Sequence, residues 1–441
     1  MTYPRVIIIG ETFHSRSGGG ITLSNLFRDW PEGLIGVITD RISETDPSDK
    51  HLYYQLGWDE IRYPFPFSKI QTYTKSGAYS FRNSGRNGEV KTHINNNRTK
   101  LLKALHNYLD RVLELTGLSP FFYSIKLSDT LRKWILEFSP DIIYIQPFQT
   151  RTMVFGNILH KELHIPYGIH IMDDSISYNN KSIILRGRHQ RYMERQFRLL
   201  VANASVRLCI SEAMSAEYFR RYGRTFLHFR NPIDVDSWLP FQKRNLSCDQ
   251  RHLKIVYTGR LFPPTFISLV EFCRVIHELN KEGAQIDFDI FSYDKNKKLD
   301  HKIQGLQGIN LHKPVQAKKI PALIHKYDIF FLCLDFDVRA QKYAKFSIST
   351  RTSEGMISGV PVLLYAPADA AISQYFKKSY AGLVVTEHSP DKLVQAIFAL
   401  WKDMELRKKL SSNAIKTAES DSHSTIVCEN FRKSLAGIAH E

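Results

Sequence analysis

The sequence is poor in features that mark several classes of protein. Its 441 residues include five cysteines, an odd number that contains no CxxC pair. We therefore expect reduced thiols, not a disulfide framework or a zinc site. No apolar run reaches the roughly 18 residues that a membrane span needs, and the start of the chain lacks a signal peptide's apolar segment. These absences predict a cytoplasmic protein.

Two kinds of cofactor signature are also missing. The glycine triplet Gly18, Gly19 and Gly20 lacks the GxGxxG spacing of a dinucleotide-binding loop, so we expect no nicotinamide site. Asp173 and Asp174 stand together, but no third carboxylate or histidine lies nearby at the spacing of a metal site. We therefore expect neither a metal ion nor an organic cofactor.

Positive charge, in contrast, is in excess. The chain has 60 Lys and Arg against 44 Asp and Glu, a formal net charge of +16. Residues 61–135 carry +9 and residues 181–230 carry +8, so the rest of the chain is nearly neutral. This distribution suits nucleic acid, an anionic membrane surface or a phosphate-bearing substrate. Each window alone would also suit an ordinary solvated surface.

Short apolar runs alternate with helix-period segments along the chain, which is typical of parallel sheets built from βαβ units. In the first half the expected strands are Val6–Gly10, Leu34–Thr39, Asp141–Pro147, Tyr167–Met172, Val206–Ser211 and Phe226–Arg230. In the second half they are Leu253–Gly259, Ile286–Ser292, Ile309–His312, Asp328–Leu334, Pro361–Tyr365 and Gly382–Thr386. The predicted fold class is α/β, with two Rossmann-like, doubly wound domains that face each other across a cleft.

A seam separates the two halves. Residues 231–252 have no apolar periodicity and predict a linker between a domain over 1–230 and a domain over 253–419. The remaining residues, 420–441, have a helical pattern that we expect to pack back across the seam. Residues 61–135 resemble a basic insertion in the first domain, with a Gly-, Asn- and Ser-rich stretch followed by an amphipathic helix.

The most informative motif begins a helix in the second domain. Ser349 or Thr350 is a suitable N-cap, and Glu354 follows one turn later. Free N–H groups, the helix dipole and Arg351 would together bind a diphosphate, and a carboxylate accepts hydroxyl hydrogen bonds such as those of a ribose. The same residues would also suit a capped amphipathic helix with Glu354 in a surface ion pair.

Five stretches of the chain carry recognisable motifs. They are IPYGIHIMDD from Ile165, RLCISEAMSAEYFRRYG from Arg207, NPID from Asn231, TGRL from Thr258 and FDVRAQKYAKFSISTRTSEGMISGVPVLLYAP from Phe336. Together they resemble the corresponding segments of GT-B glycosyltransferases close to family 4. The resemblance covers most of the chain apart from residues 61–135.

The resemblance implies roles for particular residues. The donor diphosphate would be held by Arg260, Arg351 and the helix N-terminus at Ser349 and Thr350, and the ribose by Glu354. Gly18, Gly19 and Gly20 would close over the phosphates from the first domain. On the acceptor side, His170 stands where the family often has a histidine near the reacting sugar. Asp173 would act beside it in catalysis, and Asp174 would position the acceptor.

The chain also departs from the family pattern. Thr265 stands where many members have a lysine that pairs with the diphosphate, and Phe346 stands where an E-x7-E pattern would begin. Arg351 replaces a commoner lysine and Gly355 a commoner tyrosine. Arginine suits a diphosphate. Because the lysine and the glutamate are missing, a specialised or weakly active enzyme remains an alternative.

A second motif points elsewhere. Asp335, Phe336 and Asp337 have the DxD form of the manganese site in the other glycosyltransferase fold. The motif lies too late in the chain and inside the second GT-B-like domain, so we assign it no metal.

The resemblance implies a hexosyltransferase-type enzyme that moves a sugar from a nucleotide-diphosphate sugar to a glycan or polyprenyl-diphosphate-linked acceptor. It further implies independence of metal, retention of anomeric configuration and a role in bacterial surface polysaccharide synthesis. We expect residues 61–135 to face an anionic membrane surface, with the protein peripheral on the inner face of the membrane. Two alternatives remain: a nucleotide-sugar epimerase of the same fold and an inactive binding protein. Nucleic acid is not expected, because the basic residues lack a stacking platform.

Overall fold

The computed structural model divides the chain into two compact units. It describes residues 3–14, 18–40, 42, 45–46, 49–65, 67–70, 75–79, 97–122, 124–178, 184–261, 263–292 and 301–437. Unit 1 comprises residues 1–210, 215–229 and 429–441, and unit 2 comprises residues 211–214 and 230–428. The last helix, α18 (Ser424–Ala436), therefore begins in unit 2 and ends in unit 1.

Unit 1 is built on an eight-stranded sheet with the order β10-β9-β8-β7-β1-β2-β3-β5. Its strands are β1 (Val6–Ile9), β2 (Ile35–Thr39), β3 (Leu52–Gln55), β5 (Gly77–Tyr79), β7 (Ile142–Ile145), β8 (Tyr167–Ile171), β9 (Val206–Cys209) and β10 (Leu227–His228). Neighbouring strands run parallel, except that β5 pairs antiparallel with β3. The order reverses between β1 and β7, so the loops after these strands meet at a topological switch point.

All six strands predicted for the first half are confirmed, but the sheet is larger than predicted. The sequence reading missed β3, β5 and a separate antiparallel pair, β4 (Ile61–Arg62) with β6 (Ser124–Ile125). These segments have two to four residues each. Runs this short give too little periodicity to separate a strand from a loop.

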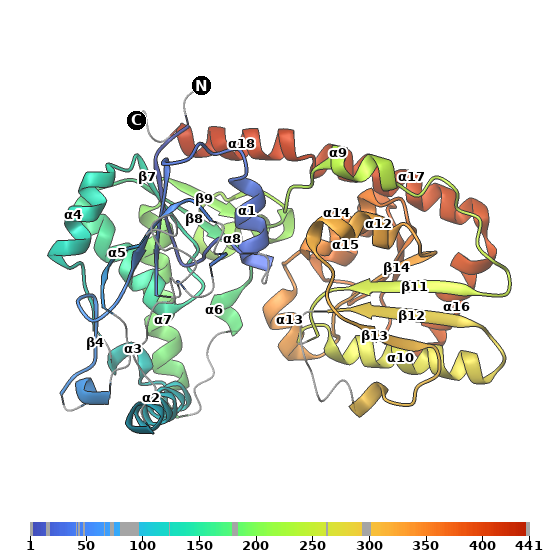
Figure 1. Cartoon of the computed structure of the whole chain (residues 1–441), viewed down its shortest axis with the longest axis horizontal. Helices are drawn as coiled ribbons and strands as arrows, with labels where there is room; N and C mark the ends of the chain where they lie inside the picture. The colour runs from blue at the N-terminus through green and yellow to red at the C-terminus, as the bar shows by residue number, and fades with distance from the viewer. Residues whose placement is uncertain are drawn as a thin grey trace. The chain divides into compact units, whose positions relative to one another are not determined.

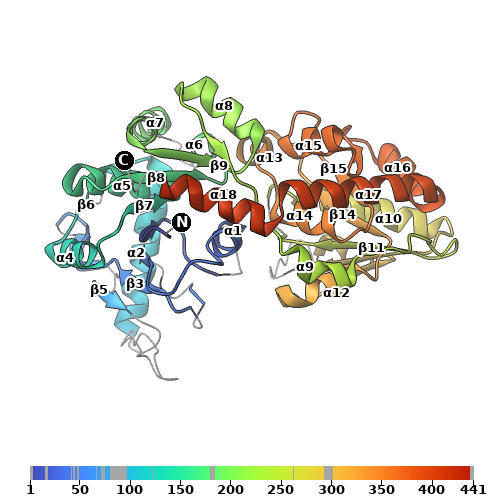
Figure 2. The same cartoon turned by 90° about the horizontal axis from the view of Figure 1, so that it is seen from above.

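Helices complete unit 1 (Figures 1 and 2). They are α1 (Gly18–Leu26), α2 (Asn97–Thr116), α3 (Ser119–Phe122), α4 (Asp129–Phe138), α5 (Thr150–Leu163), α6 (Ser175–Tyr178), α7 (Arg186–Asn203) and α8 (Glu212–Tyr222). The helix expected in the basic insertion is confirmed as α2. Most of the Gly-, Asn- and Ser-rich stretch before it lies outside the described residues.

Unit 2 contains a parallel six-stranded sheet with the order β13-β12-β11-β14-β15-β16. Its strands are β11 (Leu253–Thr258), β12 (Ile286–Phe291), β13 (Ile309–His312), β14 (Ile329–Cys333), β15 (Val362–Tyr365) and β16 (Leu383–Val385), all of them predicted. Alternate residues of β14 belong to two different cores: Phe331 joins one, and Phe330 and Leu332 join the other. The sheet is therefore buried on both faces, as parallel sheets usually are.

Helices supply the other side of each core. The helices of unit 2 are α9 (Val235–Trp238), α10 (Phe266–Lys281), α12 (Ile320–Ile324), α13 (Val338–Ala344), α14 (Thr350–Ile357), α15 (Ala371–Ser379), α16 (Pro390–Lys402) and α17 (Met404–Asp421). Figure 1 shows α10 lying along one face of the sheet, where Phe272 stacks on Phe331 with ring centroids 3.8 Å apart. Both strand and helix thus contribute large aromatic side chains to one core.

The segment predicted as a linker is held against unit 2 by a buried arginine. Arg407 in α17 is 2% exposed. Its Nε donates to the Leu246 carbonyl oxygen at 2.8 Å, and its Nη1 donates to the carbonyl oxygens of Leu400 at 2.7 Å and Trp401 at 2.8 Å. The last two acceptors lie in the final turn of α16, where the helix dipole favours a cation.

Two expectations about composition can be compared with the structure. All five cysteines are free thiols, as predicted. Among the described residues, no helix combines the length and the apolarity needed to cross a membrane.

Candidate active site

The switch point of unit 2 lies between β11 and β14, and the loop after β11 carries Arg260. Tyr257 Oη donates to the Arg260 carbonyl oxygen at 2.9 Å, and Thr265 Oγ1 donates to the same oxygen at 3.2 Å. Burial raises the pKa of Tyr257 far above its usual value, so this hydroxyl stays protonated. Thr265, which replaces the family's lysine, thus helps to fix the loop backbone, while the Arg260 residue itself is exposed.

Arg351 and Glu354 form an ion pair at the start of α14. Arg351 Nη1 lies 2.6 Å from each carboxylate oxygen of Glu354, and the two side chains are 20% and 14% exposed. The Arg351 charge opposes the rise in the pKa of Tyr257, so it acts close to the switch point. The predicted N-cap is confirmed at Ser349, whose Oγ accepts from Arg351 N at 3.3 Å. Glu354 therefore forms an ion pair with Arg351, but the pair is largely buried and is not the surface pair of the alternative.

The two aspartates of the DxD motif cap two different helices. Asp335 Oδ1 accepts from Ser268 N at 2.8 Å in the first turn of α10. Asp337 Oδ1 accepts from Arg339 N at 2.8 Å and from Ala340 N at 3.2 Å at the start of α13. Within the ranges that the structure describes, no group of three His, Cys, Asp or Glu is placed to hold a metal ion.

The switch point of unit 1 brings the ends of β1 and β7 close together. Gly10 has φ +100°, and a Cβ there would lie 2.2 Å from the Gln146 carbonyl oxygen, so only glycine fits. The predicted triplet forms the first turn of α1. A Cβ on Gly19 would lie 2.6 Å from Glu11 Oε2, and one on Gly20 would lie 2.6 Å from the His14 ring. Gly20 is thus packed tightly against His14, and Gly19 lies beside the carboxylate of Glu11, a residue that the sequence did not single out.

His170 lies inside unit 1, in β8, and is 1% exposed. Its Nδ1 is 2.6 Å from Tyr144 Oη, and its ring lies beside Phe431 with centroids 6.3 Å apart. Burial lowers the pKa of His170 to about 3, against an opposing effect of the Cys209 backbone. A histidine with these contacts stays neutral at physiological pH and holds Tyr144, which favours a structural role.

The buried imidazole predicts a pH effect on stability. The unfolded chain takes up this proton near pH 6.5 and the folded chain only near pH 3, so stability is complete above pH 6.5 and falls as the pH drops. Between pH 6.5 and pH 5 the free energy of unfolding should fall by about 2 kcal/mol from this group alone. Unfolding curves of His170→Gln should lack this part of the decline, and His228→Gln, at an exposed position, should keep it. Equal pH dependence in wild type and His170→Gln would contradict the buried neutral state.

Asp174 is the centre of a buried network. Arg221 Nη1 and Nη2 lie 3.0 and 2.9 Å from its two carboxylate oxygens, Tyr218 Oη donates to it at 3.0 Å, and Ser177 Oγ donates at 2.8 Å. The residue is 1% exposed. Asp174 therefore ties the end of β8 to α8, whereas its neighbour Asp173 is only partly buried.

The fold matches solved glycosyltransferase structures over the whole chain. HepE from Anabaena, in complex with UDP and glucose, is 14% identical with a TM-score of 0.59, covering 98% of this chain and 100% of that one. Sucrose-phosphate synthase from Thermosynechococcus elongatus is 12% identical with a TM-score of 0.59, covering 98% and 99%. WaaG, a glycosyltransferase involved in lipopolysaccharide biosynthesis, is 12% identical with a TM-score of 0.54, covering 98% and 100%. No curated protein sequence matches the chain significantly.

Sequence similarity decides the enzyme class. Residues 252–403 match the family described as glycosyl transferases group 1. The chain has the GT-B fold, and its second unit carries a group 1 glycosyltransferase domain. The predicted α/β class with two Rossmann-like domains and the predicted enzyme class are thereby confirmed.

Within this glycosyltransferase, each unit gathers part of the predicted set. In unit 2, Ser349, Thr350, Arg351 and Glu354 lie in one turn of α14 or just before it, and the Arg351 charge acts near the loop of Arg260. The sequence reading missed Glu11 and Tyr257. Glu11 follows a strand at the switch point, which was a usable signal, whereas the contact of Tyr257 with the Arg260 loop required the fold.

Proposed function

We propose that the enzyme transfers a sugar from a nucleotide-diphosphate sugar to a glycan or polyprenyl-diphosphate-linked acceptor in bacterial surface polysaccharide synthesis. The observation that carries this proposal is the group 1 match over residues 252–403, which include both Arg260 and α14. Solved structures of HepE with UDP and with UDP-glucose, and the role of WaaG in lipopolysaccharide biosynthesis, support it. Five free thiols support a cytoplasmic location.

In this proposal the second domain stabilises the leaving group. A departing nucleoside diphosphate gains negative charge, which backbone N–H groups at a helix N-terminus and fixed cations stabilise well. The N-terminus of α14, with Ser349 and Thr350, would supply the N–H groups. Arg260 and Arg351 would supply the cations. We propose that these groups stabilise the leaving group without a metal ion.

Glu354 would have two tasks in the same complex. A carboxylate offers about four lone-pair sites, and in the structure one guanidinium nitrogen lies against both of its oxygens. Glu354 can therefore orient Arg351 and still accept hydrogen bonds from ribose hydroxyls. This arrangement would set the position of the cation before the donor binds.

The first domain would supply the acceptor side. We propose that Gly18, Gly19 and Gly20 let a phosphate approach the start of α1, and that Asp173 contacts the acceptor, with retention of configuration. The contacts of His170 and Asp174 support positioning roles for both, His170 through Tyr144 and Asp174 through α8.

Thermal unfolding with a ligand panel tests the donor site. The panel contains UDP, GDP, ADP, dTDP and their glucose conjugates, each without and with EDTA. A diphosphate at 100 times its Kd should raise the free energy of unfolding by about 2.7 kcal/mol. We expect one nucleoside diphosphate to act, equally in EDTA, and its effect to be lost in Glu354→Ala.

Glu405→Ala is the matched control, because it removes another glutamate from an i, i+3 ion pair in unit 2, with Lys408. It should keep the full ligand effect. If no compound of the panel stabilised the protein against thermal unfolding, the proposed donor site would be contradicted. Stabilisation that EDTA abolishes would contradict metal independence.

A further inference from the structure

The arginines of α7 gather on its solvent-facing side. The buried side of the helix consists of His189, Met193, Phe197, Leu200 and Val201. The exposed side, opposite to it, consists of Arg188, Arg191, Arg195, Arg198, Leu199 and Ala202. With five arginines and one glutamate, the helix presents a strongly cationic face to solvent.

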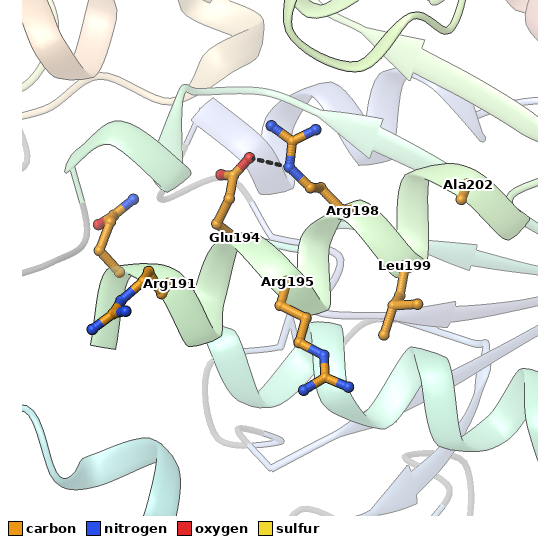
Figure 3. Close-up of a pocket in the computed structure, with 7 residues that line it drawn as sticks. Arg191, Glu194, Arg195, Arg198, Leu199 and Ala202 are labelled. Carbon is orange, nitrogen blue, oxygen red and sulfur yellow. Dashed lines mark ion pairs between the residues drawn. The ribbon is translucent and has the colours of Figure 1, made fainter. Parts of the chain in front are cut away.

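Part of this face contacts other side chains of the protein, and part is directed outward. Glu194 pairs with Arg198 at 2.9 Å, and Arg198 also lies over the Tyr222 ring, 5.0 Å from its centroid. Figure 3 shows Arg195 and Leu199 pointing to the other side of the helix from this pair. In the described part of the chain, Arg191 and Arg195 form no ion pair, so their charges remain available to an anion.

A neighbouring helix leaves an apolar stripe exposed. Leu105, Tyr108, Val112 and Leu115 of α2 are 44, 70, 36 and 49% exposed and follow one another at helical spacing. The opposite side of α2 packs inward: Leu113 is buried, and Asp110 accepts from Tyr63 Oη at 2.7 Å. The stripe therefore faces away from the protein.

The two helices meet at their ends. Leu185 N, just before α7, donates to the Thr116 carbonyl oxygen at the end of α2 at 3.0 Å. Two further apolar side chains lie within two residues of this hydrogen bond along the chain: Leu118, 42% exposed, and Ile184, 72% exposed. Exposed apolar side chains therefore lie at the junction between the end of α2 and the start of α7.

We infer that this α2–α7 surface docks on an anionic lipid bilayer. It comprises Leu105, Tyr108, Val112, Leu115, Leu118, Ile184, Arg188, Arg191, Arg195 and Leu199. A helix with an apolar stripe beside cationic side chains suits the boundary between acyl chains and anionic headgroups. The arginine guanidinium groups would pair with headgroup phosphates, while the apolar stripe would enter the acyl region. A dissolved polyanion would leave the stripe in water, so charge and apolarity together favour lipid. The inference goes beyond the proposed function and rests on no part of it.

Vesicle co-sedimentation of the full chain tests the surface. Vesicles of phosphatidylglycerol and phosphatidylcholine should bind the protein, those of phosphatidylcholine alone should bind it weakly, and binding should fall as salt is raised. Arg191→Gln with Arg195→Gln should weaken binding about 25-fold, since each basic residue near an anionic surface contributes roughly a fivefold factor. Tyr108→Ser with Val112→Ser should weaken it about tenfold or more, also at low salt.

The matched control is Lys409→Gln with Lys416→Gln, which removes the same charge from exposed positions of α17 and should bind like wild type. The inference is overturned if either surface variant binds like wild type, or if the control loses as much as the arginine variant. It is also overturned if wild type does not sediment, or if Tyr108 and Val112 are needed for a dimer in ultracentrifugation and not for vesicle binding. Circular dichroism checks that the variants fold. Because no donor is present, failure here leaves the proposed function untouched.

Discussion

Replacing Arg351 with methionine is expected to lower kcat/KM for sugar transfer by about 100-fold to 1,000-fold, the effect of removing one preorganised group that stabilises developing charge. The diphosphate is more negative in the transition state than in the bound donor, so kcat should fall more than KM rises. Methionine keeps an apolar stem of similar length, so the fold should survive. Initial rates at varied donor concentration give the two constants.

Two comparisons make this result specific. Arg274→Met, at an exposed position of α10, should change the rate by less than a factor of two. In the Arg351→Met background, adding Glu354→Ala separates the two tasks of the glutamate. No further loss means that Glu354 acts only through Arg351, and a further tenfold loss means that it also binds the donor. Near-normal activity of Arg351→Met would rule out its part in the transition state.

Replacing Arg407 with alanine is expected to destabilise unit 2 by about 4 kcal/mol or more. The change leaves three buried carbonyl oxygens without donors, each costing about 1–3 kcal/mol, and opens a cavity at a position that is 2% exposed. Thermal unfolding should show a transition lowered by about 10 °C for a unit of this size. Unit 1 should unfold near its original temperature.

Lysine at this position provides the sharper test. Arg407→Lys keeps a charge but lacks the guanidinium fork, so it should recover only part of the loss. Lys409→Ala, two residues further in α17 and exposed, should change the transition by less than 2 °C. If Arg407→Ala unfolded within 2 °C of wild type, the three carbonyl contacts would contribute little.

The regular parts of the fold could be predicted because their signals are local. In unit 2, β14 and β15 are continuous buried apolar runs, and β12 alternates buried and partly exposed residues, so both kinds of strand pattern are visible in the sequence. In unit 1, β3 pairs through residues 52–55 and β5 through residues 77–79. Their place in the sheet depends on partners far along the chain, which no short pattern reveals.

The local features of the candidate site could be predicted in the same way. The cap at Ser349 follows from residue type and spacing, and the Arg351–Glu354 pair follows from an i, i+3 interval. The burial of His170 and the network around Asp174 depend on contacts with residues 26 and 47 positions away. Motif resemblance assigns both residues to the site of sugar transfer. A motif records neighbours in sequence, so it does not reveal what surrounds a side chain in space.

The strand lengths of the two sheets bear on how copies of the protein behave in a crowded solution. Outer strands are short: β10 has two residues, β5 three, β16 three and β13 four, whereas β11 and β12 have six each. An outer strand exposes unpaired backbone groups that can recruit a strand from another chain, and short outer strands offer few of them. Edge-to-edge aggregation is therefore disfavoured in both sheets.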